Sequence, residues 1–364
     1  MNVIAIEYSP TTSRGGSERS YFDVLTGLKE RGHEITLAYL QEGNLLHKYQ
    51  AAGIKTVKIG TYMLRSGRKI KDLFLLTRAI WRLRGFSQAI VYTNFAEAFP
   101  LAACLKIIYK YKFVSHIRLN FHGSYSRQIK WAGKYMDQMI VINKMAKAEF
   151  EIEFNLPGRG SIIYNGITIP ETLLEIKLKP KLKALRLLYL GRIAPEKGVS
   201  ELVAVAAKLK AMKLFDFTLQ ITGSYIYSHS QNYQVELQEL INGYGMESII
   251  KFDLPVENPI EYVAQFDLFI FPSTWYEPFG RTVPEAILAG TPILARDVGM
   301  IAEIMMDNPD FIFDSDESLL KKIIQFYNAE LKFNFESARS TVTQSFNKDR
   351  MIKQVETTLL SNWS

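Results

Sequence analysis

The chain alternates short apolar runs with amphipathic segments of helical periodicity along both of its halves. Strands of a parallel sheet are covered by helices on both faces, so they are apolar along their whole length. This alternation is therefore typical of α/β domains with parallel sheets. Because 364 residues exceed one domain of ordinary size, we predict two doubly wound, Rossmann-like domains.

The apolar runs give the expected strands of each half. In the first half these strands cover Val3–Ile6, His33–Tyr39, Ala89–Tyr92, Lys112–His116 and Gln138–Ile142. In the second half they cover Leu185–Leu190, Thr218–Thr222, Ile249–Phe252, Leu268–Phe271 and Pro292–Ala295. Helices are expected between them, the first over about Ser17–Arg31 and the last over about Lys348–Leu360.

A turn-rich segment, Tyr164–Pro170, followed by a polar Lys/Leu stretch, marks the change of domain. We place the first domain at residues 1–168, the second at 169–345 and a final helical segment at 346–364. Rossmann-like domains bind ligands at the carboxyl ends of their strands, so two facing domains are expected to hold a ligand cleft.

Composition excludes several classes of protein. The 48% hydrophobic and 22% charged residues indicate a soluble globular chain. We expect no transmembrane helix, because no apolar run is long enough, and no signal peptide, because Glu7 comes too early. The single cysteine, Cys104, allows no intrachain disulfide and gives no metal-ligand pattern. These features favour the cytoplasm.

The charge is divided unevenly between the two halves. Residues 1–170 hold 24 Lys and Arg against 12 Asp and Glu, whereas the remainder holds 20 against 25. An anionic partner is therefore expected for the first half only.

Seven of the cations fall within twenty residues and are interleaved with large apolar side chains. Such a basic amphipathic helix suits an anionic membrane surface or acceptor. It could equally be a solvated helix that packs through its apolar face. Nucleic acid is not expected, because no binding module accompanies the charge. The cations are Arg65, Arg68, Lys69, Lys71, Arg78, Arg82 and Arg84.

The segment after the expected strand Leu268–Phe271 carries two glutamates, Glu277 and Glu285, around a strand-to-helix turn. Pro284 fits the first turn of the following helix, so the helix should begin near Arg281 or Thr282. The amides of Gly280, Arg281, Thr282 and Val283 would then lack intrahelical partners and suit a phosphate. Carboxylates beside them suit sugar or ribose hydroxyls, which indicates a phosphorylated sugar.

A second strand-to-helix loop, Gly191–Gly198, places Arg192 and Lys197 beside the expected crevice. Arginine can bind a phosphate with two nitrogens, and lysine acts as a point charge. A solvated turn with surface charges is the alternative interpretation. No P-loop, no nucleophile elbow and no metal-ligand spacing is present, so P-loop, α/β-hydrolase and metal chemistry are not expected.

Two features of the first half are weaker signals. Gly15 and Gly16 lie in the first strand-to-helix loop, where glycines allow a backbone to approach a ligand. His116 ends an apolar strand, the usual place of a ligand-contacting residue, although His122 competes with it and a structural role is common for a lone histidine.

In the order of these landmarks the chain resembles the retaining glycosyltransferases of family 4, which have the GT-B fold of two facing Rossmann-like domains. The resemblance spans nearly the whole chain. Its most specific motifs are Gly191-Arg192 with Lys197-Gly198, and Glu277-Pro-Phe-Gly280 with Glu285-Ala286.

The resemblance implies a role for each residue. Arg192 and Lys197 would bind the donor diphosphate in place of a metal ion, and Gly16 would let the first loop approach it. Glu277 would bind the donor sugar, His116 would lie near the transferred sugar, and Glu285 would bind the ribose. Further donor-binding residues would be Gly15, Gly191, Phe279, Gly280, Arg281, Thr282 and Val283.

The reaction implied is transfer of a hexosyl group, with retention, from a UDP- or GDP-sugar to a glycan or lipid-linked acceptor, without a cofactor. The last helix would cross back to the first domain. Two alternatives remain: an epimerase or phosphorylase on the same fold, and a non-enzymatic sugar-binding protein.

Overall fold

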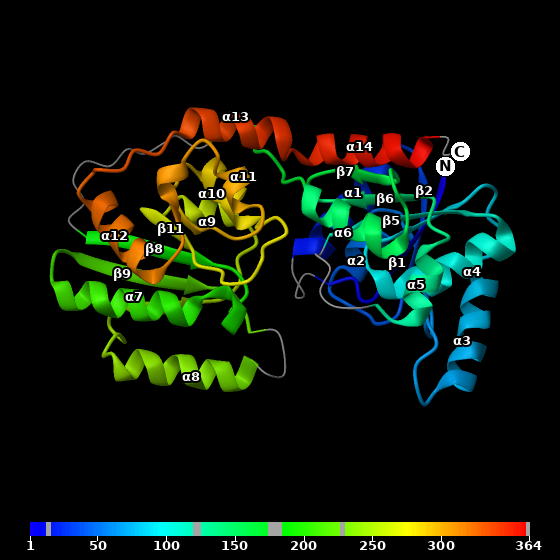
Figure 1. The fold of residues 1–364 in the computed structure, drawn as a ribbon, viewed down its shortest axis with the longest axis horizontal. Coiled ribbons are helices and arrows are strands. Elements are labelled where there is room, and N and C mark those ends of the chain that lie inside the picture. The colour runs from blue at the N-terminus through cyan, green and yellow to red at the C-terminus, as the bar shows by residue number, and fades with distance from the viewer. Residues whose placement is uncertain (12–15, 119–124, 174–183, 226–229, 362–364) are drawn as a thin grey trace. The chain divides into compact units, whose positions relative to one another are not determined.

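The computed structural model describes residues 1–11, 16–118, 125–173, 184–225 and 230–361. The chain divides into two compact units (Figure 1). The first unit comprises Met1–Gly166 with Lys348–Ser364, and the second comprises Ile167–Asn347. Each unit is built around one parallel sheet in the described residues, so the prediction of two doubly wound α/β domains is confirmed.

The first sheet has the strand order β3-β2-β1-β4-β5-β6-β7. The chain reverses its direction of winding between β1 and β4, which defines a topological switch point. The strands are β1 (Asn2–Glu7), β2 (Glu34–Tyr39), β3 (Lys55–Lys58), β4 (Ile90–Thr93), β5 (Lys112–Ile117), β6 (Gln138–Val141) and β7 (Gly160–Ile162).

Both faces of this sheet are buried. Ile4 and Ile6 of β1 belong to one apolar core, whereas Val3 and Ala5 belong to the other, as the alternation of side chains along a strand requires. The helices are α1 (Gly16–Glu30), α2 (Leu46–Ala51), α3 (Lys69–Arg82), α4 (Phe99–Tyr109), α5 (Arg127–Gly133), α6 (Lys144–Phe154) and α14 (Lys348–Leu360), with a single turn at Ala96–Ala98.

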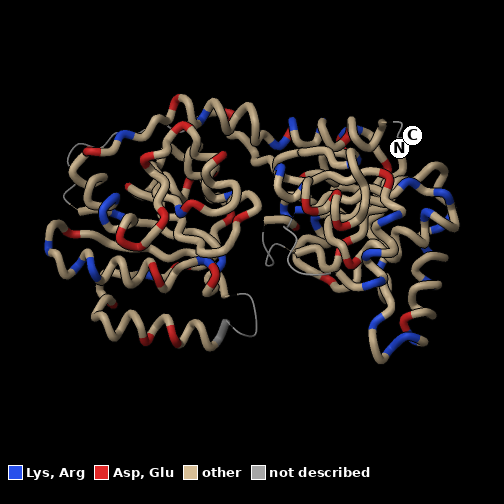
Figure 2. The backbone as a smooth tube through the Cα atoms, viewed as in Figure 1, with Lys and Arg blue, Asp and Glu red and all other residues tan. Residues whose placement is uncertain are grey.

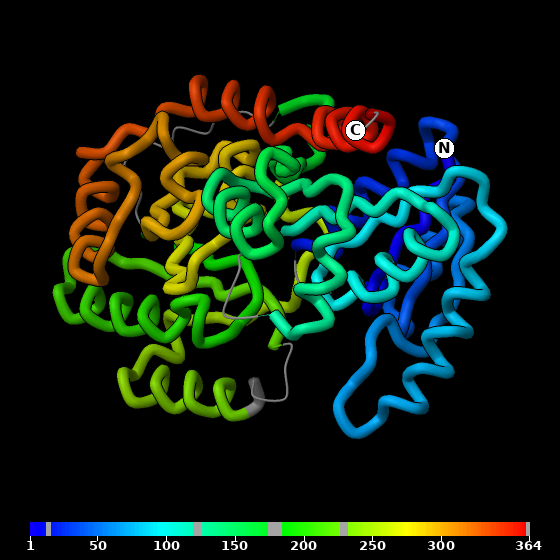
Figure 3. The backbone as a smooth tube through the Cα atoms, turned by 45° about the vertical axis from the view of Figure 1, so that its right-hand side comes forward, coloured from blue at the N-terminus to red at the C-terminus, as the bar shows by residue number. Residues whose placement is uncertain are grey.

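The C-terminal helix α14 packs on α1 of the first unit (Figures 1 and 3). Gly27 lies where the two helices meet, because a Cβ atom there would come within 2.4 Å of the Ile352 side chain. Glu356 of α14 also accepts a hydrogen bond from Arg31 at 2.9 Å and lies 2.7 Å from Nε2 of His33. The final helix therefore completes the core on the α1 face of the sheet.

The second sheet has the order β10-β9-β8-β11-β12-β13, with its switch point between β8 and β11. Its strands are β8 (Ala184–Leu190), β9 (Asp216–Thr222), β10 (Ile250–Asp253), β11 (Leu268–Phe271), β12 (Ile293–Arg296) and β13 (Ile312–Phe313). The helices are α7 (Val199–Met212), α8 (Ser230–Gly243), α9 (Pro259–Val263), α10 (Thr282–Ala289), α11 (Ile301–Ile304), α12 (Asp316–Tyr327) and α13 (Phe335–Ser345), with single turns at Pro195–Lys197 and Pro309–Phe311.

Three strands were not predicted from the sequence: β3, β7 and β13. All three lie at the edges of their sheets and are at most partly apolar or very short. An edge strand is covered less completely than a central one, so it lacks the continuous apolar run on which the prediction depended.

Candidate functional site

The candidate donor residues of the second unit lie at the carboxyl ends of β8 and β11, the two strands at its switch point. Gly191, Arg192 and Lys197 follow β8, and Glu277 follows β11. Parallel pairing of Leu268 with Leu187 aligns these two strands, so both loops leave the same edge of the sheet. Ligands of doubly wound sheets bind at this position.

Lys197 and Glu277 are in direct contact. The Lys197 ammonium donates to Oε1 of Glu277, and the hydroxyl of Ser273 donates to the same oxygen at 2.7 Å. Ser273 is fully buried and Glu277 is 7% exposed. The carboxylate is therefore held in one orientation by a cation and a hydroxyl from the two neighbouring loops.

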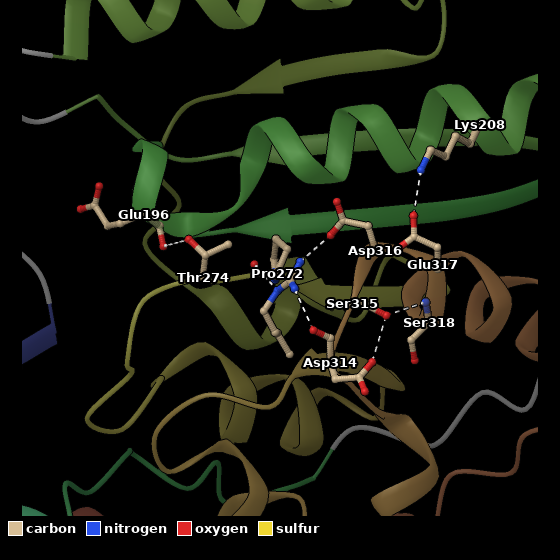
Figure 4. A network of polar contacts seen from close by, with 10 residues as sticks. Glu196, Lys208, Pro272, Thr274, Asp314, Ser315, Asp316, Glu317 and Ser318 are labelled. Atoms are coloured by element: carbon tan, nitrogen blue, oxygen red, sulfur yellow. Dashed lines mark hydrogen bonds and ion pairs between the residues drawn. The ribbon is translucent and has the colours of Figure 1, made fainter.

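The two loops are also tied together through the main chain. The carbonyl oxygen of Glu196 accepts from the amides of Thr274 at 3.1 Å and Trp275 at 3.2 Å. It also accepts from the Thr274 hydroxyl at 3.3 Å (Figure 4). The Glu196 carboxylate pairs with the Arg192 guanidinium at 2.7 Å. Both cations predicted to bind phosphate thus have carboxylate partners in this unit.

The end of β11 is fixed from the other side by Arg296, the last residue of β12. Its guanidinium donates to the carbonyls of Pro272 and Asp314, both at 3.2 Å, and to the Asp316 carboxylate at 2.6 Å (Figure 4). Arg296 therefore joins the point where the Glu277 loop begins to the start of α12. It is a structural support that the sequence did not indicate.

Gly299 packs closely against the backbone of the Glu277 loop. Its φ is +61°, and a Cβ atom there would lie 2.0 Å from the carbonyl oxygen of Glu277. That carbonyl accepts from the amide of Met300 at 3.0 Å. Only glycine combines the left-handed conformation with this close approach.

Helix α10 begins at Thr282, directly after Arg281, as predicted. One expected free donor is wrong: the Val283 amide donates to the Gly280 carbonyl at 3.0 Å. Such i→i+3 bonds commonly satisfy amides in the first turn of a helix. Glu285 is 6% exposed, and its carboxylate lies 4.0 Å from Nε of Arg281.

Phe279 points into the protein core. It is 3% exposed and packs edge-to-face on Phe346, with ring centroids 5.3 Å apart. Gly280 has a φ of +68° and follows it directly, so the chain turns sharply here before α10. Gly191 donates its amide to the Thr222 carbonyl at 3.0 Å, which fixes the start of the Arg192 loop.

The candidate residues of the first unit lie around β5. His116 is fully buried in this strand, and its Nδ1 atom is 2.6 Å from the Tyr92 hydroxyl and 3.0 Å from Nη2 of Arg118. Gly16 is the first residue of α1. Gly15 and His122 lie outside the described residues.

The imidazole of His116 is kept neutral. Burial, and secondarily the neighbouring Arg118 charge, hold its pKa well below the ordinary value. Two tyrosines, Tyr21 and Tyr92, lie in the same region, and burial raises the pKa values of their hydroxyl groups. The region therefore contains the permanent cation of Arg118, and the charge of Glu7, at the end of β1, acts on the same Tyr21.

Within the described part of the chain, no three His, Cys, Asp or Glu side chains gather in a way that could hold a metal ion. No described helix is long and apolar enough to cross a membrane.

The structure resembles solved structures of known proteins over its whole length. HepE of Anabaena, solved in complex with UDP and glucose, superposes with a TM-score of 0.81 at 20% identity, covering 99% of both chains. The fold is therefore GT-B, as predicted.

Two family patterns match in tandem, "Glycosyltransferase Family 4" over residues 14–169 and "Glycosyl transferases group 1" over residues 172–344. The chain belongs to these group 1, family 4 glycosyltransferases, and it is a glycosyltransferase enzyme.

Two relatives match over most of the chain. An "uncharacterized 42.6 kDa protein in cps region" of Klebsiella pneumoniae is 25% identical and covers 87% of this chain and 90% of its own length. A glycogen synthase of Mycobacterium tuberculosis is 26% identical over 69% of this chain and 61% of its own length.

Sequence reasoning missed Ser273, Arg296, Gly299 and Arg118 as parts of these two regions. Ser273 had a usable signal, because it is a polar residue immediately after an apolar strand. The others become informative only through partners that are distant along the chain.

Proposed function

We propose that the enzyme transfers a hexosyl group, with retention, from a UDP- or GDP-sugar to a glycan or lipid-linked acceptor in the synthesis of a polysaccharide or glycolipid. The contact of Lys197 and Ser273 with the Glu277 carboxylate carries the proposal. It places a cation that can bind a phosphate beside a carboxylate that can accept hydrogen bonds from sugar hydroxyls. A nucleotide-sugar donor has both groups and needs both partners.

In this proposal the diphosphate lies against Lys197 and Arg192 at the start of α10. These cations stabilise the charge that develops on the departing nucleoside diphosphate, so no metal ion is required. Glu277 then binds hydroxyls of the donor sugar, Glu285 binds the ribose, and His116 lies near the transferred sugar. The complex of HepE with UDP and glucose supports a nucleotide-sugar donor.

The donor is identified by thermal shift with a panel of UDP- and GDP-sugars, since a bound ligand raises apparent stability. Transfer is then followed by NMR, which reports whether the product keeps the anomeric configuration. Addition of EDTA should leave the rate unchanged. Conversion of the nucleotide sugar without any acceptor would instead identify an epimerase.

Lys197→Ala and Glu277→Ala should each lower turnover by about 10²-fold or more. The matched control is Lys208→Ala, which removes another Lys–Glu pair of the same unit, 3.3 Å from Glu317 (Figure 4). This variant should leave turnover nearly unchanged, because the Lys208 side chain is 52% exposed and exposed ion pairs contribute little to stability. Near-normal turnover in Lys197→Ala or Glu277→Ala would contradict the assignment.

We further propose that the first unit associates with an anionic membrane surface through α3. Ile70, Leu73, Phe74 and Trp81 are exposed by 89%, 53%, 67% and 57%. Their spacing places them on one face of the helix, whereas Leu76 and Ala79 pack into the core on the other. Lysine and arginine gather along α3 and the segment before it (Figure 2).

An exposed apolar stripe flanked by cations is the pattern of a helix that lies in a lipid interface. The double variant Ile70→Ser/Phe74→Ser should lose binding to vesicles that contain phosphatidylglycerol. Reversal of Arg78, Arg82 and Arg84 to Glu should remove it as well. Ile152→Ser on α6 changes an equally exposed residue, 81%, and should bind as the unmodified protein does. Unchanged binding of both α3 variants would refute this part.

A further inference from the structure

Phe279 belongs to the Glu277 loop, yet its ring is turned into the second unit. The side chain is 3% exposed, so it offers almost no surface to a donor. Its effect on the site must therefore come through the backbone that it fixes. Only Pro278 separates it from Glu277, and a proline fixes its own φ and restricts the residue before it. The position of the Phe279 ring thus constrains the backbone of Glu277.

The ring of Phe279 packs on the ring of Phe346. The two rings lie edge-to-face, with centroids 5.3 Å apart and planes at 72° to each other. Phe346 is 2% exposed and comes directly after α13. Aromatic pairs in this arrangement attract each other beyond the effect of the area that they bury. Phe346 therefore forms a fixed surface against which the Glu277 loop packs.

The backbone of Phe346 is held on both sides. Its amide donates to the Val342 carbonyl at 2.9 Å, and its carbonyl accepts from the amide of Ile167 at 2.8 Å. The next residue, Asn347, forms a parallel bridge with Ile167. Ile167 and Asn347 are the first and last residues of the second unit. Phe346 thus lies beside both points at which the chain enters and leaves this unit.

Helix α13, which ends at Phe346, is itself firmly attached to the unit and packs on α10 and α11 (Figure 1). Asp307 accepts from the hydroxyls of Ser337 at 2.6 Å and Thr341 at 2.8 Å. Arg339 donates to the carbonyl of Leu288, in the last turn of α10, at 2.9 Å. The helix therefore supports α10 at its far end, and Phe346 supports the loop that precedes α10.

We infer that Phe346 is a positioning residue for the donor site and that it acts through Phe279 on the Glu277 carboxylate. It holds the loop in the conformation in which this carboxylate meets its cation and its hydroxyl donor. Because its carbonyl is bonded to Ile167, it also ties the loop to the point at which the chain enters the unit. The consequence for turnover rests on the proposed function, which assigns Glu277 to the donor sugar.

Hydrogen exchange in the ligand-free, full-length protein tests the positioning directly. Phe346→Leu removes the ring and keeps the side chain apolar. The matched control is Phe311→Leu, because the Phe311 ring is 1% exposed and pairs edge-to-face with Phe333, centroids 5.0 Å apart. Both variants should lose a similar amount of thermal stability. Only Phe346→Leu should exchange faster across residues 273–283.

Turnover measures the consequence for the reaction. Phe346→Leu should lower kcat/KM for the nucleotide sugar by about tenfold, since a displacement of about 1 Å can cost up to about 10²-fold. Phe311→Leu should leave kcat/KM nearly unchanged. In a Phe279→Leu background, Phe346→Leu should cause little further loss, because two residues that act through one contact are not additive.

Equal exchange across residues 273–283 in Phe346→Leu and Phe311→Leu would overturn the inference. Equal losses of kcat/KM in these two variants, or full additivity with Phe279→Leu, would do the same. If Phe346→Leu does not fold, Phe346→Met is held to the same outcomes, because methionine adapts to irregular core spaces. Failure of every UDP- and GDP-sugar as donor would count against the proposed function, whereas the exchange experiment needs no ligand and still decides the inference.

Discussion

The hydroxyl of Ser273 gives the sharpest test of how the second unit holds its carboxylate. It is fully buried and donates to Oε1 of Glu277 at 2.7 Å, and it lies at longer distances, 3.3 and 3.4 Å, from the carbonyls of Glu196 and Trp275. Ser273→Ala removes this donor and adds no bulk. We predict that it disturbs the position of the carboxylate while Lys197 remains in contact with it.

The magnitude follows from the charge of the acceptor. A hydrogen bond to a charged group contributes about 1.5–3 kcal/mol. If the carboxylate is needed in the transition state, a loss of about 2 kcal/mol lowers kcat/KM by about 30-fold. The free energy of unfolding should fall by about 1–2 kcal/mol, because a buried carboxylate oxygen loses one of its donors.

Steady-state kinetics with the identified donor, together with thermal unfolding, measure both effects. Thr274→Ala is the matched control, because its hydroxyl donates to the Glu196 carbonyl at 3.3 Å and not to the Glu277 carboxylate. It should leave kcat/KM within about threefold, since an exposed hydrogen bond contributes little. Equal effects of the two substitutions, or unchanged kinetics in a folded Ser273→Ala protein, would refute the reasoning.

Two further predictions concern the backbone under Glu277 and the buried histidine. Gly299→Ala should lower the free energy of unfolding by clearly more than Gly67→Ala in thermal unfolding. Both residues have positive φ, +61° and +76°, but of these two only Gly299 has another part of the backbone within contact of an added Cβ atom. Equal losses in the two variants would show that the backbone conformation alone, and not this clash, causes the destabilisation. Since the pKa of His116 is depressed in the fold, the unfolded chain binds a proton below about pH 6.5 that the folded chain does not. Stability should therefore fall as the pH drops below that value, by at most about 1.4 kcal/mol per pH unit, and His116→Gln should flatten this part of a denaturation series; an unchanged slope would contradict it.

The elements of the fold could be predicted closely from local patterns. The expected strand Leu268–Phe271 and the expected helix Lys348–Leu360 have the bounds that the structure gives them. Both are strongly patterned segments, one continuously apolar and one amphipathic, so their neighbours in sequence suffice to define them. The start of α10 was predictable for a similar reason, because Pro284 fits only the first turn of a helix.

Details of hydrogen bonding were less accessible. The Val283 amide was expected to be free, but a tight turn with Gly280 uses it. The edge strands β3 and β13 also escaped prediction, because pairing with a neighbour, rather than their own composition, makes them strands.

The sequence by itself determined the two parallel α/β domains, the family motifs and the residue types at the strand ends, because apolar periodicity and turn residues act over short distances along the chain. Tertiary structure decided which of these residues meet. Lys197 contacts Glu277 across 80 residues, and Arg118 contacts Asn165 across 47. These pairs depend on strand order, which long-range packing selects and no local pattern encodes.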